Sequence, residues 1–296
     1  MVESFLKYIQ FEKRYSPKTV LSYQTDLTQF EQFLSATFQE NNIEAAEYGL
    51  IRAWIVSLVE SKLDASSINR KIACLRSFYK FLMRQEIVTK NPMTKIRILK
   101  TQKRLPHFVK EDDMTMLLDG QKSNEDFPDT LEGWRDRLLI EFLYGTGMRL
   151  SELIHLKESQ VNLTGKTVKV LGKRNKERII PFADNLVSII EAYRKVRNRE
   201  VEMRNHGFLF VTDSGDQLYP MFVNRSIKKH LKNSGTEKKS PHVLRHTYAT
   251  HLLNKGAEIN AVKDLLGHSS LAATQVYTHN SMEKLKKVFD QAHPKA

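Results

Sequence analysis

The segment EGWRDRLLIEFLYGTGMRLSEL, residues 132–153, gives the clearest structural signal in the chain. Its first part, 132–144, is rich in large apolar residues and is typical of a buried helix. Gly145 and Gly147 follow at the point where such a helix would terminate. Arg149 then begins a second helix, so its side chain and the first N–H groups of that helix could face one anion. Glu152 lies one turn further on and could orient Arg149 or a histidine.

Length and composition limit the class of protein. A chain of 296 residues is long enough for two domains, and 41% hydrophobic residues are enough to form their cores. With 27% charged residues and no long apolar run, we expect neither a membrane span nor a signal peptide. The single cysteine, Cys74, excludes an internal disulfide and is expected to be a small core residue. A cytoplasmic location follows from these observations.

The charge balance points to a polyanionic partner. The chain has 47 Lys and Arg against 34 Asp and Glu, a net charge of +13. A folded protein with this excess often binds nucleic acid, although a basic surface without a partner is the alternative.

The first 94 residues are predicted to form a helical domain. Ser16 and Pro17 have the features of an N-cap and a first helical position. A second helix is predicted to start at Ser66-Ser67. Its apolar stripe is formed by Ile68, Ile72, Leu75, Tyr79 and Leu82. The opposite, basic face carries Asn69, Arg70, Ser77, Lys80 and Arg84. That face could be solvated or could contact a phosphate backbone, so Arg70, Lys80 and Arg84 are candidate DNA-binding residues.

Residues 95–106, KIRILKTQKRLP, contain five basic residues and no acid. We expect an extended linker here, which could let two basic domains close around a duplex or could be a plain tether. The second domain, 107–296, is predicted to be rich in helices, with a β-hairpin from 167–171 and 178–182. The expected fold is therefore mainly α, with one small antiparallel β element.

The segment HVLRHTYATH, residues 242–251, allows three interpretations. His242 and His246 have the spacing of a zinc-binding helix, but Val243 stands where a zinc protease has glutamate, and Arg245 would repel the metal. His242 and Arg245 are three residues apart and could both donate to one phosphate. The third interpretation is a helix packed in the core. His246 is expected to pack beside the site and not to be a ligand.

A further histidine and a tyrosine follow in LLGHSSLAATQVYTH, residues 265–279. His268 comes directly after Gly267, and Tyr277 lies nine residues later in a polar stretch. A tyrosine in such a stretch is usually a partly buried packing residue.

Taken in order along the chain, these segments and GKRNKER, residues 172–178, resemble the tyrosine recombinase (phage integrase) family. The N-terminal half, including SPKTVLSYQTDLTQF, resembles the core-binding domain of that family, and the compact layout and the ending AHPKA resemble its Xer branch. Arg174 stands where a glycine is often found, so Lys176 is the alternative to Lys173 as the acid. Ala273 stands where the family often has threonine.

The resemblance implies a catalytic domain with six catalytic residues: Arg149, Lys173, His242, Arg245, His268 and Tyr277. Tyr277 would be the nucleophile that attacks a DNA phosphodiester and forms a 3′-phosphotyrosyl link. Arg149 and Arg245 would neutralise the transition state, and His268 would donate to a non-bridging oxygen. His242 would assist proton transfer from the phenol. Lys173 would protonate the leaving 5′-oxygen. With two arginines and a lysine around the phosphate no metal would be needed, and the covalent link would store the bond energy, so that no ATP would be needed either.

The resemblance also implies the partners. These are double-stranded DNA, a homo- or hetero-tetramer on two DNA sites, a second Xer recombinase and an FtsK-type DNA translocase. The expected task is resolution of chromosome dimers; the alternatives are a mobile-element integrase with the same chemistry and a DNA-binding protein without catalysis. The last segment, 281–296, is predicted to form a helix that docks on a neighbouring subunit, with docking on its own chain as the alternative.

Overall fold

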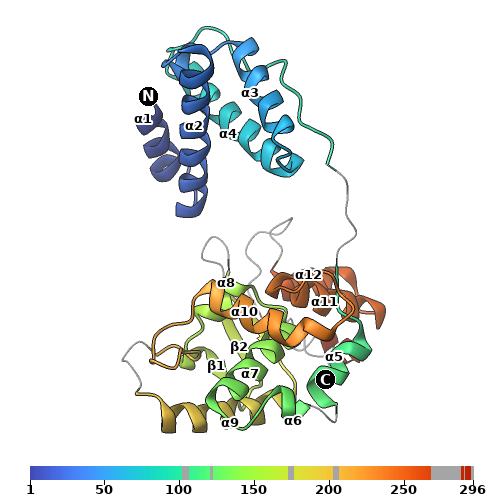
Figure 1. Ribbon diagram of the computed structural model, residues 1–296. Coiled ribbons are helices and arrows are strands. Elements are labelled where there is room, and N and C mark those ends of the chain that lie inside the picture. Colours follow the sequence, from blue (N-terminus) through green and yellow to red (C-terminus); the bar gives the residue numbers. More distant parts are fainter. Residues whose placement is uncertain are drawn as a thin grey trace. The chain divides into compact units, whose positions relative to one another are not determined.

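The computed structural model describes residues 1–101, 107–120, 123–172, 177–202, 207–267, 288–289 and 291–294. The chain divides into two compact units, Met1–Arg104 and Leu105–Ala296, each with its own hydrophobic core. Helices dominate both units, and a small three-stranded sheet lies in the second (Figure 1), which confirms the predicted fold class. None of the described helices has the length and apolar character that a bilayer crossing requires.

The first unit is a set of short and medium helices around an aromatic core. Its elements are α1 (Val2–Lys7), η1 (Tyr8–Glu12), α2 (Pro17–Phe38), η2 (Ile43–Ala45), α3 (Tyr48–Glu60) and α4 (Ala65–Arg84). The predicted start of α2 is confirmed, because the Ser16 hydroxyl accepts from the Thr19 N–H at 3.2 Å and Pro17 is the first helical residue. Cys74 is buried in this core, as predicted.

The start of α4 differs from the prediction by two residues. The helix begins at Ala65, and its N-cap is Asp64, whose carboxylate accepts from the Ser66 N–H at 2.8 Å. Serine and aspartate are both good N-caps, so residue preference alone could not distinguish them.

The first part of the predicted linker is fixed to α4. Asn69 donates to the Leu99 carbonyl at 2.9 Å and accepts from the Leu99 N–H at 2.8 Å. Arg76 donates to the carbonyl of Ile96, whose side chain is buried in the first core. Ile96 and Leu99 therefore lie against the first unit, and 102–106 lie outside the described residues.

The second unit is built around a long buried helix, Leu131–Thr146. Its first elements are α5 (Glu111–Asp119), α6 (Ser123–Asp126), α7 (Leu131–Thr146), α8 (Leu150–Ile154) and η3 (Glu158–Gln160). The later helices are α9 (Asp184–Glu200), α10 (Pro220–His230), η5 (Leu231–Asn233), α11 (Pro241–Asn254) and α12 (Ile259–Leu266). The predicted buried helix is confirmed as α7, which packs against α9 and α11.

A meander of three antiparallel strands packs beside these helices. The strands are β1 (Val161–Asn162), β2 (Thr167–Leu171) and β3 (Glu177–Pro181), in the order β1-β2-β3. The predicted hairpin is confirmed, with β3 beginning one residue earlier than expected. Val168 pairs with Val161 on one side and with Ile180 on the other. The two-residue strand β1 was too short to be seen in the sequence pattern.

Candidate active site

A glycine turn sets the first part of the site. Gly147 ends α7 with φ of 60°, a left-handed conformation that favours glycine. A Cβ atom at this position would lie 2.5 Å from Cδ1 of the buried Tyr248 ring on α11. The glycine therefore lets the end of α7 approach α11 closely, and two residues later it places Arg149 at the start of α8.

Arg149 and Glu152 are joined at the start of α8 by an ion pair and a backbone hydrogen bond. Glu152 accepts from the Arg149 backbone N–H at 2.7 Å and from its guanidinium at 2.8 Å. The prediction that Glu152 could orient Arg149 is confirmed. The Arg149 side chain is 33% exposed, whereas that of Glu152 is 3% exposed. Arg149 is therefore held by a buried carboxylate and remains open to solvent.

Arg245 reaches the same region from α11. It is 9% exposed and donates to the Gly147 carbonyl at 2.5 Å and to the Leu266 carbonyl at 2.6 Å. Burial, with the positive charges of Arg149 and Arg178, lowers the pKa of Arg245 to about 10. The guanidinium stays protonated at neutral pH, in a cluster whose positive charges repel one another.

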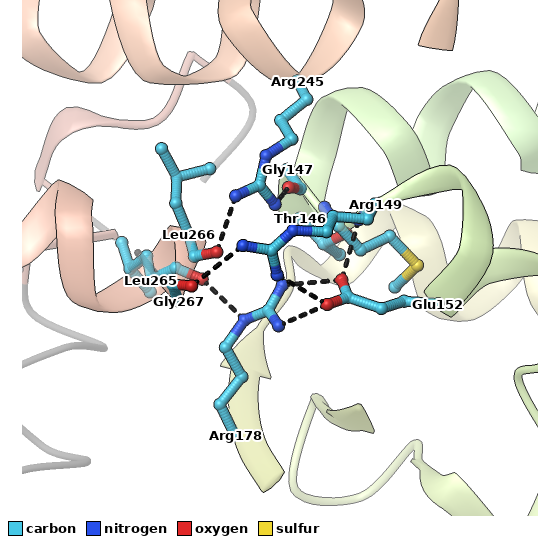
Figure 2. A network of polar contacts seen from close by, with 10 residues as sticks. Thr146, Gly147, Arg149, Glu152, Arg178, Arg245, Leu265, Leu266 and Gly267 are labelled. Carbon is cyan, nitrogen blue, oxygen red and sulfur yellow. Dashed lines mark hydrogen bonds and ion pairs between the residues drawn. The ribbon is translucent and has the colours of Figure 1, made fainter. Parts of the chain in front are cut away.

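Three consecutive carbonyls at the end of α12 each accept from a different arginine (Figure 2). The pairs are Leu265 with Arg178 Nε at 3.0 Å, Leu266 with Arg245 at 2.6 Å, and Gly267 with Arg149 at 2.9 Å. The C-terminal carbonyls of a helix carry partial negative charge, which suits them to guanidinium groups. The end of α12, directly before His268, is thereby fixed to the arginine cluster.

Arg178 is part of this cluster, although the sequence motifs did not predict it as a site residue. It comes from β3 and makes a bidentate ion pair with Glu152, at 2.7 and 2.8 Å. The period of two in a strand places Arg178 on the same side as the buried Ile180, and this alternation was a signal that could have revealed it. Burial raises the pKa of the Glu152 carboxyl, but hydrogen bonds from Arg178 and Arg149 outweigh this effect and lower it overall.

His242 and His246 lie in the first two turns of α11. His242 directly follows Pro241, the first residue of the helix, and is exposed, three residues before Arg245. His246 is half-buried; burial, together with the charge of His242, lowers its pKa. Within the described parts of the chain, no three His, Cys, Asp or Glu side chains come together in a way that could hold a metal ion.

The structure thus brings together Arg149, Glu152, Arg178 and Arg245, with His242 on the helix that carries Arg245. The other three predicted catalytic residues, Lys173, His268 and Tyr277, lie outside the described residues. Their neighbours are placed: Leu171 and Glu177 pair at the end of the hairpin, and Gly267 ends α12.

The three candidate DNA-binding residues of α4 differ in their contacts. Arg70 forms an ion pair with the buried Asp26, and Arg84 donates to the Tyr8 hydroxyl at 3.1 Å. Lys80 is exposed.

Part of the C-terminal segment packs on its own chain. Phe289 and Ala292 are buried in the core of the second unit, and His293 stacks on Phe289 with ring centroids 4.7 Å apart. The first part of the predicted docking helix, 281–287, lies outside the described residues.

Comparison with known proteins assigns the chain to a family. Residues 107–284 match the phage integrase family, and residues 2–86 match the N-terminal SAM-like domain of phage integrases. The chain belongs to the phage integrase family. A tyrosine recombinase XerC of Chlorobaculum parvum is 37% identical and covers 100% of this chain and 94% of its own. One of Staphylococcus saprophyticus is 39% identical over 99% of this chain and 97% of its own. The chain is a tyrosine recombinase, as its sequence indicated.

Solved structures share the fold of this phage integrase family member. The Tn1549 transposon integrase in complex with transposon right-end DNA is 18% identical, with a TM-score of 0.72, and covers 97% of this chain and 98% of its own. The XerH recombinase bound to its difH substrate is 21% identical, with a TM-score of 0.70, and covers 97% of this chain and 83% of its own.

Proposed function

We propose that this recombinase cleaves and rejoins DNA at a specific site through a 3′-phosphotyrosyl intermediate, with Tyr277 as nucleophile. The observation that carries the proposal is the convergence of Arg149 and Arg245, from two helices far apart in sequence, on the glycine turn at Gly147 and the end of α12. Two guanidinium groups fixed in one region suit a phosphodiester, whose two non-bridging oxygens accept hydrogen bonds from arginine.

The charge of the site fits this substrate. Three arginines and one glutamate give the cluster a net charge of +2. A phosphodiester carries one negative charge, and attack by an oxygen nucleophile adds a second in the pentavalent transition state. The cluster therefore complements the transition state better than the ground state, which is the condition for electrostatic catalysis.

The remaining roles follow the family resemblance. His242, exposed at the start of α11, assists proton transfer from the tyrosine hydroxyl. Lys173 belongs to the segment that joins β2 and β3, and it protonates the leaving 5′-oxygen. His268 directly follows Gly267, the last of the three residues whose carbonyls accept from the arginines, and it donates to a non-bridging oxygen. The phosphotyrosyl bond conserves the energy of the broken phosphodiester, so religation to another strand requires no ATP. The positive charges of Arg149, Arg245 and Lys173 around the phosphate take the place of a metal ion.

We further propose that 1–94 is a DNA-binding domain, 95–106 a basic linker and 107–296 a catalytic domain. Ile96 and Leu99 of the linker pack on the DNA-binding domain. The protein acts in the cytoplasm as a tetramer on two DNA sites, with a second Xer recombinase and an FtsK-type translocase, and resolves chromosome dimers. The full-length likeness to proteins named XerC supports this task over that of a mobile-element integrase. In the tetramer, 281–296 docks on the neighbouring subunit, which requires Phe289 to leave the core of its own chain.

Covalent trapping tests the chemistry. A duplex with a nick beside the cleavage position loses a short fragment after attack, so the protein–DNA adduct accumulates. The wild type should give an adduct that is stable in detergent, and Tyr277→Phe should give none. An adduct with Tyr277→Phe, or none with the wild type on sites recovered by footprinting, would contradict the proposal.

A further inference from the structure

Arg178 is a charged side chain in the interior of a strand. It is 4% exposed and faces the core side of β3 with Ile180. A buried guanidinium is costly unless it is paired and hydrogen-bonded. Arg178 meets that condition through two hydrogen bonds to Glu152 and one to the Leu265 carbonyl, which use three of its five N–H donors.

The carboxylate that Arg178 holds is the one that holds Arg149. Oε1 of Glu152 accepts from Arg178 at 2.7 Å and from the Arg149 guanidinium at 2.8 Å. Oε2 accepts from Arg178 at 2.8 Å and from the Arg149 backbone N–H at 2.7 Å. Each oxygen has two donors, so the carboxylate has little freedom to rotate. Arg178 thereby fixes the direction in which Glu152 presents its oxygens to Arg149.

The exposure of the three side chains shows which one can contact a substrate. Arg149 is 33% exposed, whereas Arg178 and Glu152 are 4% and 3% exposed.

Arg178 also determines how much of the positive charge of Arg149 is available to a substrate. Without Arg178, Glu152 would neutralise Arg149, and Arg245 would be the one arginine of this cluster with an uncompensated charge.

We propose that Arg178 is a positioning residue for the recombinase reaction. It acts through Glu152, aiming the Arg149 guanidinium at the scissile phosphate and cancelling the glutamate's charge so that Arg149 and Arg245 keep theirs. The inference rests on the proposed function, since it requires Arg149 to bind the phosphate.

The experiment measures covalent adduct formation by the full-length protein on a synthetic nicked duplex. The duplex carries a site recovered by sequencing the DNA fragments that the wild type traps covalently. Four proteins are compared with the wild type: Arg178→Met, Arg178→Lys, Arg178→Met/Glu152→Gln and Tyr277→Phe. Fluorescence anisotropy measures the affinity for the duplex, and circular dichroism measures folding. The cleavage rate is measured at a saturating concentration of protein.

Arg178→Met should lower the cleavage rate by about 100-fold, the effect of losing one electrostatic donor at a reacting group. The dissociation constant for the duplex should change less than about threefold, because many other phosphates contribute to affinity. The double variant should recover about tenfold of the lost rate, since an uncharged glutamine no longer neutralises Arg149. Cleavage rates are compared for the folded fraction of each variant, because Glu152→Gln also removes the unpaired buried carboxylate and would restore folding if the role of Arg178 were purely structural.

Arg178→Lys keeps the positive charge opposite Glu152 and loses the bidentate geometry. Because no buried carboxylate is left unpaired, we expect it to fold, and it tests the inference even where Arg178→Met does not fold. Its cleavage rate should fall about tenfold. The inference would be overturned if Arg178→Lys cleaved at the wild-type rate. It would also be overturned if Arg178→Met folded and the double variant cleaved no faster than it. Either result would leave the proposed function intact. No adduct with the wild type would overturn the proposed function and this inference with it.

Discussion

The Arg245 guanidinium donates to the Gly147 carbonyl at 2.5 Å and thereby joins α11 to the turn that ends α7. The contact connects residues 98 positions apart in the sequence. It depends on the left-handed backbone at Gly147, which points that carbonyl toward α11. The geometry of the arginine cluster therefore depends on a residue without a side chain.

Gly147→Ala tests this dependence. Alanine pays about 1–2 kcal/mol in the left-handed region, and its Cβ would lie 2.5 Å from the buried Tyr248 ring. Overpacking of this kind adds about 1–3 kcal/mol. We expect the free energy of unfolding of the second unit to fall by about 2–5 kcal/mol. Cleavage of a nicked site should also slow by at least about tenfold, because the cluster loses its alignment.

Gly145→Ala is the matched control, two residues earlier in α7. A Cβ there would meet nothing within 4 Å, and the residue is helical. Alanine should leave cleavage unchanged and stabilise the helix by about 0.5–1 kcal/mol. Equal effects of the two alanines in chemical denaturation would contradict the assigned role of Gly147.

The arginine cluster should bind a small oxyanion without DNA. Burial and repulsion lower the pKa of Arg245 to about 10, so a bound anion relieves an electrostatic cost at neutral pH. For a dissociation constant of about 1 mM, 10 mM inorganic phosphate would stabilise the folded state by about 1.4 kcal/mol. The thermal midpoint should rise by about 4 °C relative to chloride at equal ionic strength.

Two variants separate this site from a general salt effect. Arg245→Gln removes a guanidinium from the cluster and should abolish most of the phosphate-dependent rise. Arg199→Gln removes an exposed arginine that pairs with Glu200, and it should retain the wild-type response. A rise of the same size in all three proteins would mean that phosphate acts elsewhere.

Glu152 should give the second unit a defined dependence on pH. Its pKa is lowered in the folded state, so its contribution is present above the unfolded pKa of about 4.3 and is lost as the pH falls through the lower, folded value. Glu152→Gln should cost about 3 kcal/mol at pH 7, because two arginines lose a buried anion. This difference from wild type should shrink as the pH falls below about 4.

The fluorescence of Trp134 can report this unit separately, because the other tryptophan, Trp54, lies in the first unit and can be replaced by Phe. Urea unfolding followed by Trp134 at pH 3 to 7 gives the required free energies. Glu177→Gln is the control: it pairs with Lys169 at the surface and should cost less than about 1 kcal/mol. A cost of Glu152→Gln that does not change with pH would contradict the assigned ion pairs.

Local signals in the sequence were sufficient to predict where individual helices and the hairpin begin or end. Ser16-Pro17 marked the start of α2, and the glycines after 144 marked the end of α7. Alternating residues beside the turn-like 172–177 marked the hairpin. Each of these depends on a few adjacent residues, whose backbone preferences act in the same way wherever the segment lies in the fold.

Long-range partners were beyond the reach of the same reasoning. The sequence pattern places Asn69 on a basic face, but its amide is hydrogen-bonded to Leu99, 30 residues away. The same kind of pattern places Arg178 in a hairpin, but Glu152 and the end of α12 hold it in the interior. A polar side chain can face solvent or a buried partner, and the sequence around it does not say where that partner is.

Arg70 and Lys80 on α4 should behave differently toward DNA. The Arg70 guanidinium is bound to Asp26, which is 1% exposed, whereas Lys80 is exposed. Lys80→Ala should therefore reduce the slope of log affinity against log salt by about 0.9, the loss of one phosphate contact. Arg70→Ala should leave that slope nearly unchanged and should destabilise the first unit by about 1–2 kcal/mol, because Asp26 keeps Lys71 as its remaining cation.

Anisotropy titrations of a labelled 30-base-pair duplex at several salt concentrations measure the slope, and Trp54 fluorescence in urea measures the stability of the first unit. Any duplex serves, because contacts to phosphate do not depend on base sequence. If Arg70→Ala lowers the slope as much as Lys80→Ala, Arg70 leaves Asp26 to bind DNA. The ion pair would then be a resting state of a DNA contact, and not a fixed part of the helical core.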